Sequence, residues 1–500
     1  MMTHWCVLKK ERNSLGASQN SEEAKVPLWL QLARQRLGVR QPSAVVRSLC
    51  ALSQSARGLA QSKSFASLLP QHDSLVSRKF GTNCFLTMII SIVLFVLGGT
   101  NRAQALSAGN FLPADYVKDG SVSYQQELQR AIDAAGKSGE TLDFPAMTYA
   151  VDETGLRLHS GLTVRMEGAV FRLGVGCKAD GAVFVGKDVT DVTLIGGTII
   201  GQNAVWGDGI NIRGVYITGK SARIRIRDMA MRDLSSNGIG IFGEDSAPIR
   251  DVWIQDVIIE NCCNRYRDYL SKEKGEKGST REDQGLIACY FVEDFFVGGC
   301  RLERSRSDGT HFYRCTRGQF IGNKVYAAKM GGYFIETSDD VVATGNLLIE
   351  NGSRGATIER GSKRSVFSGN TVSLSGREGL WAPDCVGLVI ADNIFDRNGR
   401  KANGPTKRYT WNSNITVNEA YGDKSGSPTA DYLITGNVIY STTNQIAAIR
   451  VDANETVSGI VIRNNLLRGE NGTIMLEGPR QAEAVLGDNE GAAVTHSPNP

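Results

Sequence analysis

The sequence predicts an all-β solenoid, a stack of short coils in which each coil adds one strand to each of several parallel sheets. Three observations lead to this prediction: a repeat of 23 to 24 residues, an asparagine at a fixed position of that repeat, and short apolar runs separated by turns without a helical period. One such unit cannot bury an apolar face by itself, so successive units must stack to form a core.

The repeat is clearest between residues 309 and 400. Each of four successive units opens with a glycine, at Gly309, Gly332, Gly355 and Gly379. Each unit then carries an asparagine after a second apolar run, in a series that comprises Asn323, Asn346, Asn370 and Asn393 and resumes at Asn437 and Asn465. Parallel stacking puts equivalent residues of successive coils about 4.8 Å apart. The amide side chains are therefore expected to hydrogen-bond from coil to coil in a ladder.

Repeats of this length with an asparagine ladder resemble the right-handed parallel β-helix of the pectate-lyase-like superfamily, over residues 125–487. The resemblance implies a single-stranded right-handed parallel β-helix of about 22–24 residues per coil. The segment "YQQELQRAIDAAGKSGETLDFPAMTYAV" is similar to that superfamily's N-terminal capping helix, with an apolar stripe of Leu128, Ile132 and Ala135 that covers the first coil. The superfamily usually has a glycine where this chain has Met147.

The composition divides the chain into four parts. Residues 1–105 carry 13 Lys and Arg against 4 Asp and Glu, so the rest of the chain holds 43 of the 56 basic and 48 of the 52 acidic residues. We expect residues 1–74 to be a disordered or non-translated extension, 75–105 a signal peptide, 106–490 the β-helix domain and 491–500 a disordered tail. The mild acidity of the domain argues against a nucleic-acid partner.

Three features of the segment 75–105 predict an export signal. Arg78 and Lys79 precede an apolar run over residues 84–99, and the tripeptide "AQA" ending at Ala105 forms a cleavage site. The run is shorter than the roughly 20 residues that span a bilayer. We therefore expect cleavage after this tripeptide and a secreted or periplasmic protein without stable membrane insertion. An uncleaved N-terminal anchor is the alternative.

Counting from each glycine predicts which side chains leave the coils, because neighbours along a strand point to opposite faces. The first and third residues are expected in the core: Thr310/Phe312, Tyr333/Ile335, Ala356/Ile358 and Leu380/Ala382. The second and fourth are expected to form an exposed outer strip: His311/Tyr313, Phe334/Glu336, Thr357/Glu359 and Trp381/Pro383. The same count behind Gly285 places Ile287 and Cys289 on that strip.

The strip is rich in aromatic residues and bordered by arginines. This combination suits an anionic polysaccharide, because sugar rings stack on aromatic faces and carboxylates pair with guanidinium groups. The predicted substrate-binding residues on the coils are Phe334, Glu336, Arg354, Glu359, Arg360, Arg377 and Trp381. A long irregular insertion, residues 262–284, adds Tyr269 and Lys272. The alternative is that the Arg and Glu residues only form a structural salt-bridge ladder.

Cleavage of a uronate chain by β-elimination requires a cation at the carboxylate, a base for the C5 proton and an acid at the leaving oxygen. His311 and Tyr313 are the predicted base and acid, and Arg314 is the predicted cation, with Arg354 and Arg360 as alternatives. The resembled superfamily includes such lyases, and some of them use Ca²⁺. The sequence shows no clustered aspartates of the kind that bind Ca²⁺. We therefore predict a monomeric polysaccharide lyase, acting on a substrate such as alginate, that uses no metal or other cofactor.

Three other functions stay open. A glycoside hydrolase needs two carboxylates, and a spacing near 5 Å between Glu336 and Glu359 would suit a retaining enzyme. Two carboxylates this close require a nearby cation or a shared proton. A uronate C5 epimerase shares the proton abstraction, although Asp308-Gly-Thr-His311 only loosely matches the superfamily's Asp/His pairing. A non-catalytic carbohydrate-binding surface solenoid would keep the aromatic residues but would not require His311 or Tyr313.

Overall fold

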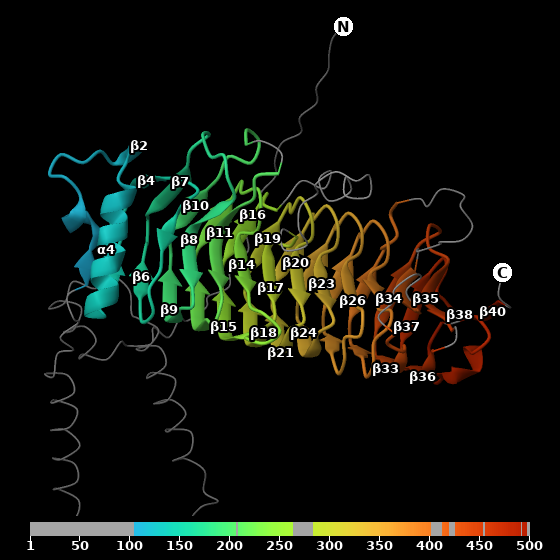
Figure 1. The fold of residues 1–500 in the computed structure, drawn as a ribbon. Coiled ribbons are helices and arrows are strands. Elements are labelled where there is room, and N and C mark those ends of the chain that lie inside the picture. The colour runs from blue at the N-terminus through green and yellow to red at the C-terminus, as the bar shows by residue number, and fades with distance from the viewer. Residues whose placement is uncertain are drawn as a thin grey trace, which may run out of the picture. The chain divides into compact units, whose positions relative to one another are not determined.

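The computed structural model describes residues 105–206, 209–263, 284–401, 413–419, 426–453, 456–491 and 493–497. These residues form the predicted right-handed parallel β-helix, with three sheets of 14, 13 and 13 strands that we call A, B and C. The coils follow one another along the stack from helix α4 (Gln125–Ser138) to the last strand (Figure 1). The expected extension 1–74 and the signal peptide 75–105, apart from its last residue, lie outside the described residues.

Sheet C carries the predicted strip. Sheet A runs from β1 (Leu106–Ser107) to β39 (Ala484–Leu486), and sheet B from β2 (Asp119–Ser123) to β37 (Leu466–Gly469). The strands of sheet C are β5 (Leu156–Arg157), β8 (Gly181–Lys187), β11 (Ile212–Thr218), β14 (Ile239–Phe242), β17 (Ile287–Tyr290), β20 (Thr310–Tyr313), β23 (Tyr333–Glu336), β26 (Ala356–Glu359), β29 (Leu380–Trp381), β32 (Ser413–Asn418), β35 (Ala447–Asp452), β38 (Thr473–Glu477) and β40 (Ala493–Ser497). Residues 493–497, expected in a disordered tail, instead form β40 because they pair with the open edge of β38.

Helix α4 caps the first coil, as predicted. It buries Leu128, Ala131, Ile132 and Ala135 and ends at Gly139, which adopts a left-handed φ of 71°. The apolar stripe packs beside a short 3₁₀ helix, η2 (Ala108–Phe111), and β5. A second 3₁₀ helix, η5 (Gln481–Glu483), lies near the other end of the stack. Among the described residues, no helix has the length and apolar character needed to cross a membrane.

The asparagine ladder is confirmed. Each Nδ2 donates to the Oδ1 of the asparagine in the next coil at 2.8–3.1 Å, through Asn323, Asn346, Asn370, Asn393, Asn437 and Asn465, and Asn489 adds a further rung. The six predicted members are at most 1% exposed. Because a buried amide without a partner is costly, each asparagine depends on the coil above and the coil below it.

The inward-facing residues also follow the prediction. All eight of the side chains expected in the core are at most 1% exposed. Tyr333, Ala356 and Leu380 are directly paired between neighbouring coils, which confirms the spacing of 23 to 24 residues. Phe312 and Phe320 pack with Tyr333 inside the coils as an aromatic cluster.

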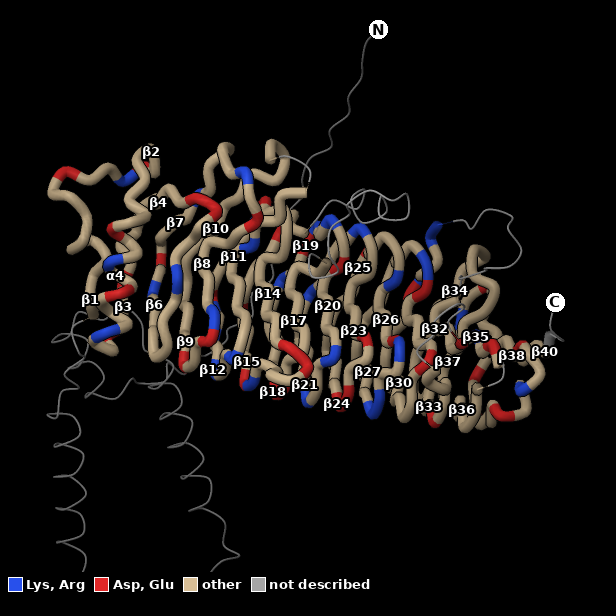
Figure 2. Tube along the Cα trace, viewed as in Figure 1, with Lys and Arg blue, Asp and Glu red and all other residues tan. Residues whose placement is uncertain are grey.

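Charged residues of both signs are interspersed along the coils (Figure 2). Many form ion pairs between neighbouring coils, such as Arg317 with Asp294 at 2.7 Å and Arg364 with Asp340 at 2.7 Å. These side chains are about half exposed, so each pair is expected to contribute only about 0–1 kcal/mol to stability.

Candidate functional site

Two lanes of side chains leave the outer face of sheet C. The histidine lane comprises Ala288, His311, Phe334, Thr357 and Trp381, and the glutamate lane comprises Phe242, Tyr290, Tyr313, Glu336 and Glu359. Both lanes point away from the core, as predicted, but the expectation of an exposed strip is wrong. His311, Thr357 and Trp381 are 0%, 5% and 9% exposed, because neighbouring side chains pack over one another across the coils.

The register of one predicted coil is wrong. The pairs Ala288–His311 and Tyr290–Tyr313 place Ala288 and Tyr290 on the outer face, whereas Cys289, expected on the strip, pairs with Phe312 in the core. The count from Gly285 is off by one because Leu286, and not the glycine, occupies the position of Gly309. A shift of one residue moves every side chain of a strand to the opposite face.

His311 lies between a tyrosine and a carboxylate. Its Nδ1 is 2.8 Å from the hydroxyl of Tyr290, and its Nε2 is 3.6 Å from Oε2 of Glu336. The ring of Phe334 stacks on the imidazole with centroids 4.6 Å apart. These contacts come from three successive coils, so the stacking of β17, β20 and β23 positions the histidine. The arrangement can move a proton from the tyrosine to the imidazole and stabilise the resulting imidazolium by the carboxylate.

Arg360 joins the two glutamates of the glutamate lane. Its Nη1 is 3.1 Å from Oε1 of Glu336, and its Nε is 3.3 Å from Oε1 of Glu359. The two carboxylates are directly paired in β23 and β26, as predicted, and the guanidinium supplies the cation that their like charges require. Arg360 occupies the left-handed turn at the end of β26, with φ of 55°, and its side chain is 39% exposed.

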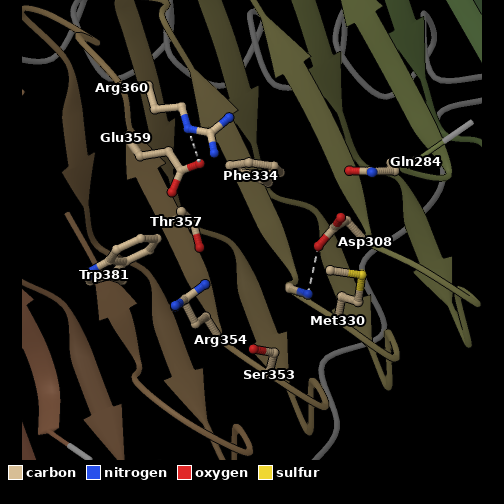
Figure 3. A pocket seen from close by; sticks show the side chains of 11 residues that line it. Gln284, Asp308, Met330, Phe334, Ser353, Arg354, Thr357, Glu359, Arg360 and Trp381 are labelled. Atoms are coloured by element: carbon tan, nitrogen blue, oxygen red, sulfur yellow. Dashed lines mark hydrogen bonds and ion pairs between the residues drawn. The ribbon is translucent and has the colours of Figure 1, made fainter. Parts of the chain in front are cut away.

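A cleft of about 240 Å³ opens beside these residues. Its wall includes Glu359, Arg360 and Trp381 on one side and Asp308 and Gln284 on the other (Figure 3). The remaining lining residues are Met330, Gly331, Phe334, Ser353, Arg354 and Thr357. The cleft therefore combines guanidinium groups, which can bind the carboxylate of an acidic sugar, with aromatic rings and carboxyl groups.

Arg354 is a cation of the cleft wall that is held by two neighbouring groups. Its guanidinium carbon lies 3.9 Å from the centroid of the Trp381 ring, and its Nε is 3.2 Å from Oε2 of the fully buried Glu378. Arg377 approaches the same carboxylate oxygen, with its Nε at 3.7 Å. These three groups, two guanidiniums and one carboxylate, carry one net positive charge beside the cleft, and Arg354 is the one that lines it.

Five predicted residues within the described part of the chain do not line the cleft: His311, Glu336, Arg377, Tyr313 and Arg314. Tyr313 is half-buried and packs against Tyr290, with ring centroids 5.3 Å apart. Arg314 occupies the left-handed turn that leaves sheet C, with φ of 50°, and its Nη1 lies 3.4 Å from Oδ1 of Asp245. The structure thus separates the predicted cation from the cleft. Tyr269 and Lys272 lie outside the described residues.

Sequence reasoning gave Gln284 no role in the site and named Asp308 only in the epimerase alternative. Asp308 is 4% exposed and accepts a hydrogen bond from the backbone N–H of Gly331 at 2.7 Å. Burial raises the pKa of Asp308 to about 7, although the Gly331 N–H and the charge of Arg354 act in the opposite direction. Asp308 directly precedes Gly309, the first residue of a repeat unit, and this position could have marked it as a site residue. However, Asp-Gly is also an ordinary sequence for a turn.

The donor set of the cleft does not suit a metal ion. Among the residues that the structure describes, no group of three or more His, Cys, Asp or Glu side chains converges on one point. In the cleft, Glu359 is paired with Arg360 and the Asp308 carboxyl is desolvated, whereas Ca²⁺ requires six to eight oxygen ligands.

Replacing Arg360 by alanine is expected to destabilise the protein by about 1–2 kcal/mol, because it leaves two buried carboxylates facing each other. Chemical denaturation measures this change. Arg364→Ala is the matched control, since this arginine also pairs with carboxylates of a neighbouring coil but its side chain is 58% exposed, and its loss should cost under about 1 kcal/mol. Equal effects of the two substitutions would contradict a specific role for Arg360.

Comparisons with known proteins agree with this fold. The family model described as right handed beta helix region matches residues 285–425. The A-module of the Azotobacter vinelandii mannuronan C-5 epimerase AlgE6 is 14% identical, with a TM-score of 0.53 over 79% of this chain and 99% of that chain. A mutant of the tailspike protein of E. coli bacteriophage HK620 is 12% identical, with a TM-score of 0.53 over 89% of this chain and 84% of that chain.

The Streptococcus pneumoniae surface adhesin PfbA is also similar, with 17% identity and a TM-score of 0.50 over 79% of this chain and 93% of that chain. A comparison with curated protein sequences found no significant match. At identities this low, the structural likeness shows the β-helix fold, and the function must be argued from the site.

Proposed function

We propose that the protein cleaves a uronate-containing polysaccharide by β-elimination. The observation that carries this proposal is the Tyr290–His311–Glu336 chain beside Arg360. The chain holds a hydroxyl, an imidazole and a carboxylate in contact on three coils, and the adjacent guanidinium lines the cleft. Proton abstraction next to a carboxylate needs this combination of a base and a cation.

The reaction then assigns one role to each group. His311 takes the proton of the Tyr290 hydroxyl, and Glu336 stabilises the imidazolium. The tyrosinate removes the C5 proton, while Arg360 neutralises the carboxylate on which negative charge develops. The electron pair forms the C4–C5 double bond as the C4–O4 bond breaks. Tyr313, adjacent to Tyr290 in the glutamate lane, donates the proton to the leaving oxygen O4.

Two further observations support a glycan substrate. The aromatic rings of Phe334 and Trp381 line the cleft and offer stacking surfaces for pyranose rings. The similar tailspike mutant was solved in complex with a pentasaccharide, and the similar A-module belongs to a mannuronan C-5 epimerase. We also propose that the protein works outside the cytoplasm, where such polymers occur, after removal of the predicted signal peptide.

A glycoside hydrolase is the second candidate. Asp308 and Glu359 line the same cleft, and the raised pKa of Asp308, about 7, keeps much of this group protonated near neutral pH. A protonated acid and an ionised carboxylate are the two groups that glycoside hydrolysis uses. Asp308 and Glu359 lie two coils apart and at different positions along the coil. This separation weighs against a glycoside hydrolase.

One experiment separates the candidates. The mature protein is incubated with alginate, pectate and chondroitin in deuterated water, and three products are measured. Ultraviolet absorbance of an unsaturated uronate indicates the proposed lyase, whereas reducing ends without this absorbance indicate a hydrolase. Deuterium at C5 without chain cleavage indicates an epimerase. Binding of a polymer without any of the three would contradict an enzymatic function and favour a carbohydrate-binding solenoid.

A further inference from the structure

In each coil, a turn precedes the strand of sheet C. One position of this turn holds a polar residue in three of four successive coils and a glycine in the fourth. Asp308, Gly331, Arg354 and Glu378 occupy the same position of four successive coils, as the backbone hydrogen bonds between these coils show. Three of the four have polar side chains, and Gly331 has none. A Cβ atom at Gly331 would lie 3.0 Å from Oδ1 of Asp308, so the missing side chain leaves open the space between Asp308 and Arg354.

Two buried polar atoms belong to residues that line the cleft beside this gap. Oδ2 of Asp308 and Nε2 of Gln284 are shielded from solvent and have no hydrogen-bond partner within the described part of the chain. Both residues are less than a twentieth exposed, at 4% and 2%, and both line the cleft. Buried polar atoms are nearly always paired in folded proteins, so two such atoms without a partner in the wall of one cleft indicate the place of a ligand.

The other border of the gap is cationic. Arg354 faces the cleft from two coils beyond Asp308, about 10 Å away between equivalent backbone atoms. Its ring contact with Trp381 and its ion pair with Glu378 hold the guanidinium in place. With Arg377 on the same carboxylate, this border keeps one net positive charge.

We propose that the gap at Gly331 is a subsite for the carboxylate of a second uronate residue, with Arg354 as its counter-ion and the Asp308 carboxyl and Gln284 amide as its hydrogen-bond partners. The inference rests on the proposed function in taking a uronate chain as ligand. It adds that the unit next to the one that reacts must also be acidic. The enzyme therefore selects blocks of consecutive uronates over chains in which uronates alternate with neutral sugars.

The subsite also predicts a pH dependence. The acid form of Asp308 donates a hydrogen bond to the bound carboxylate, whereas the ionised form repels it. Since burial raises the pKa of Asp308 to about 7, affinity should fall as the pH rises through neutrality. The other charged groups of the cleft wall are Arg354, Glu359 and Arg360, and Glu378 pairs with both Arg354 and Arg377 beside it. Asp308→Asn keeps a donor and removes this titration.

Calorimetric titration with an oligouronate of four residues tests the subsite. The full chain carries His311→Gln to suppress turnover, and affinity is measured at about pH 5.5 and about pH 8.5, on either side of the pKa. We expect affinity to fall about tenfold between the two, and Asp308→Asn to reduce this change to less than about twofold. Gly331→Ala should weaken binding about tenfold or more at both values, because the methyl group enters the gap. Gly176→Ala, whose Cβ would meet nothing within 4 Å, is the matched control.

The outcomes separate the two proposals. Unchanged affinity in Gly331→Ala, an unaltered pH dependence in Asp308→Asn, or no binding of the oligouronate would each overturn the subsite, even if the protein proved to be a lyase. The expected binding pattern without any unsaturated product would support the subsite and refute the lyase. A tetrasaccharide with its carboxylates reduced to alcohols should bind at least about tenfold more weakly, and equal binding would also overturn the subsite.

Discussion

Glutamine in place of His311 is expected to lower the rate of polysaccharide cleavage by about 10³-fold and to leave the protein folded. The imidazole is the group that takes the tyrosine proton, and it is held at 2.8 Å from the Tyr290 hydroxyl. Glutamine is similar in size and can still accept a hydrogen bond, but it cannot be protonated near neutral pH. The rate is measured from the unsaturated product, and folding from thermal unfolding.

Two companion variants make this result specific. His159→Gln replaces an exposed histidine that pairs with Asp133 on the capping helix, and it should retain full activity. Tyr290→Phe removes the hydroxyl and should lower the rate by about 10²-fold or more, as should Tyr313→Phe for loss of the proposed acid. Near-normal rates in His311→Gln would show that the Tyr290–His311–Glu336 chain is a structural element and not the catalytic centre.

Alanine at Asn346 is expected to lower the free energy of unfolding by about 3 kcal/mol. The asparagine accepts from the backbone N–H and the side chain of Asn323, and it donates to the carbonyl of Phe320 and to Oδ1 of Asn370. Removal of the amide leaves several buried polar groups unpaired in two neighbouring coils. Urea-induced unfolding, followed by circular dichroism, measures the loss.

Asn489 is the matched control for this variant. It is the last rung of the same ladder and makes the same kinds of hydrogen bonds, but it is only half-buried, so water can replace its amide. Asn489→Ala should therefore cost under about 1 kcal/mol. An equal loss at the two positions would show that burial does not decide the contribution of a rung.

The fold could be predicted from the sequence because its signals repeat. Glycines, asparagines and apolar residues recur at 23 to 24 residues, and stacking converts this sequence spacing directly into spatial neighbourhood. The pairing of Glu336 with Glu359 followed from the same rule. The prediction failed at Cys289 and Tyr290, where a long insertion precedes the strand and the glycine no longer marks the register.

The residues in turns were harder to place. Arg354 and Arg360, two of the predicted binding residues, line the cleft, whereas Arg314, in the turn equivalent to that of Arg360, lies near Asp245. Strand residues alternate between two faces, but a turn residue has no such periodicity. The direction of its side chain depends on which partners the neighbouring coils supply, and these lie far away in the sequence.

The sequence by itself determined the all-β solenoid, its capping helix, its asparagine ladder and the face that holds His311, because each depends on local periodicity repeated over many coils. Only the tertiary structure decided that Tyr290 is the partner of His311, that Arg360 joins Glu336 and Glu359, and that Gly331 leaves a gap between Asp308 and Arg354. These contacts depend on the register between coils and on burial, and both arise only when distant segments stack.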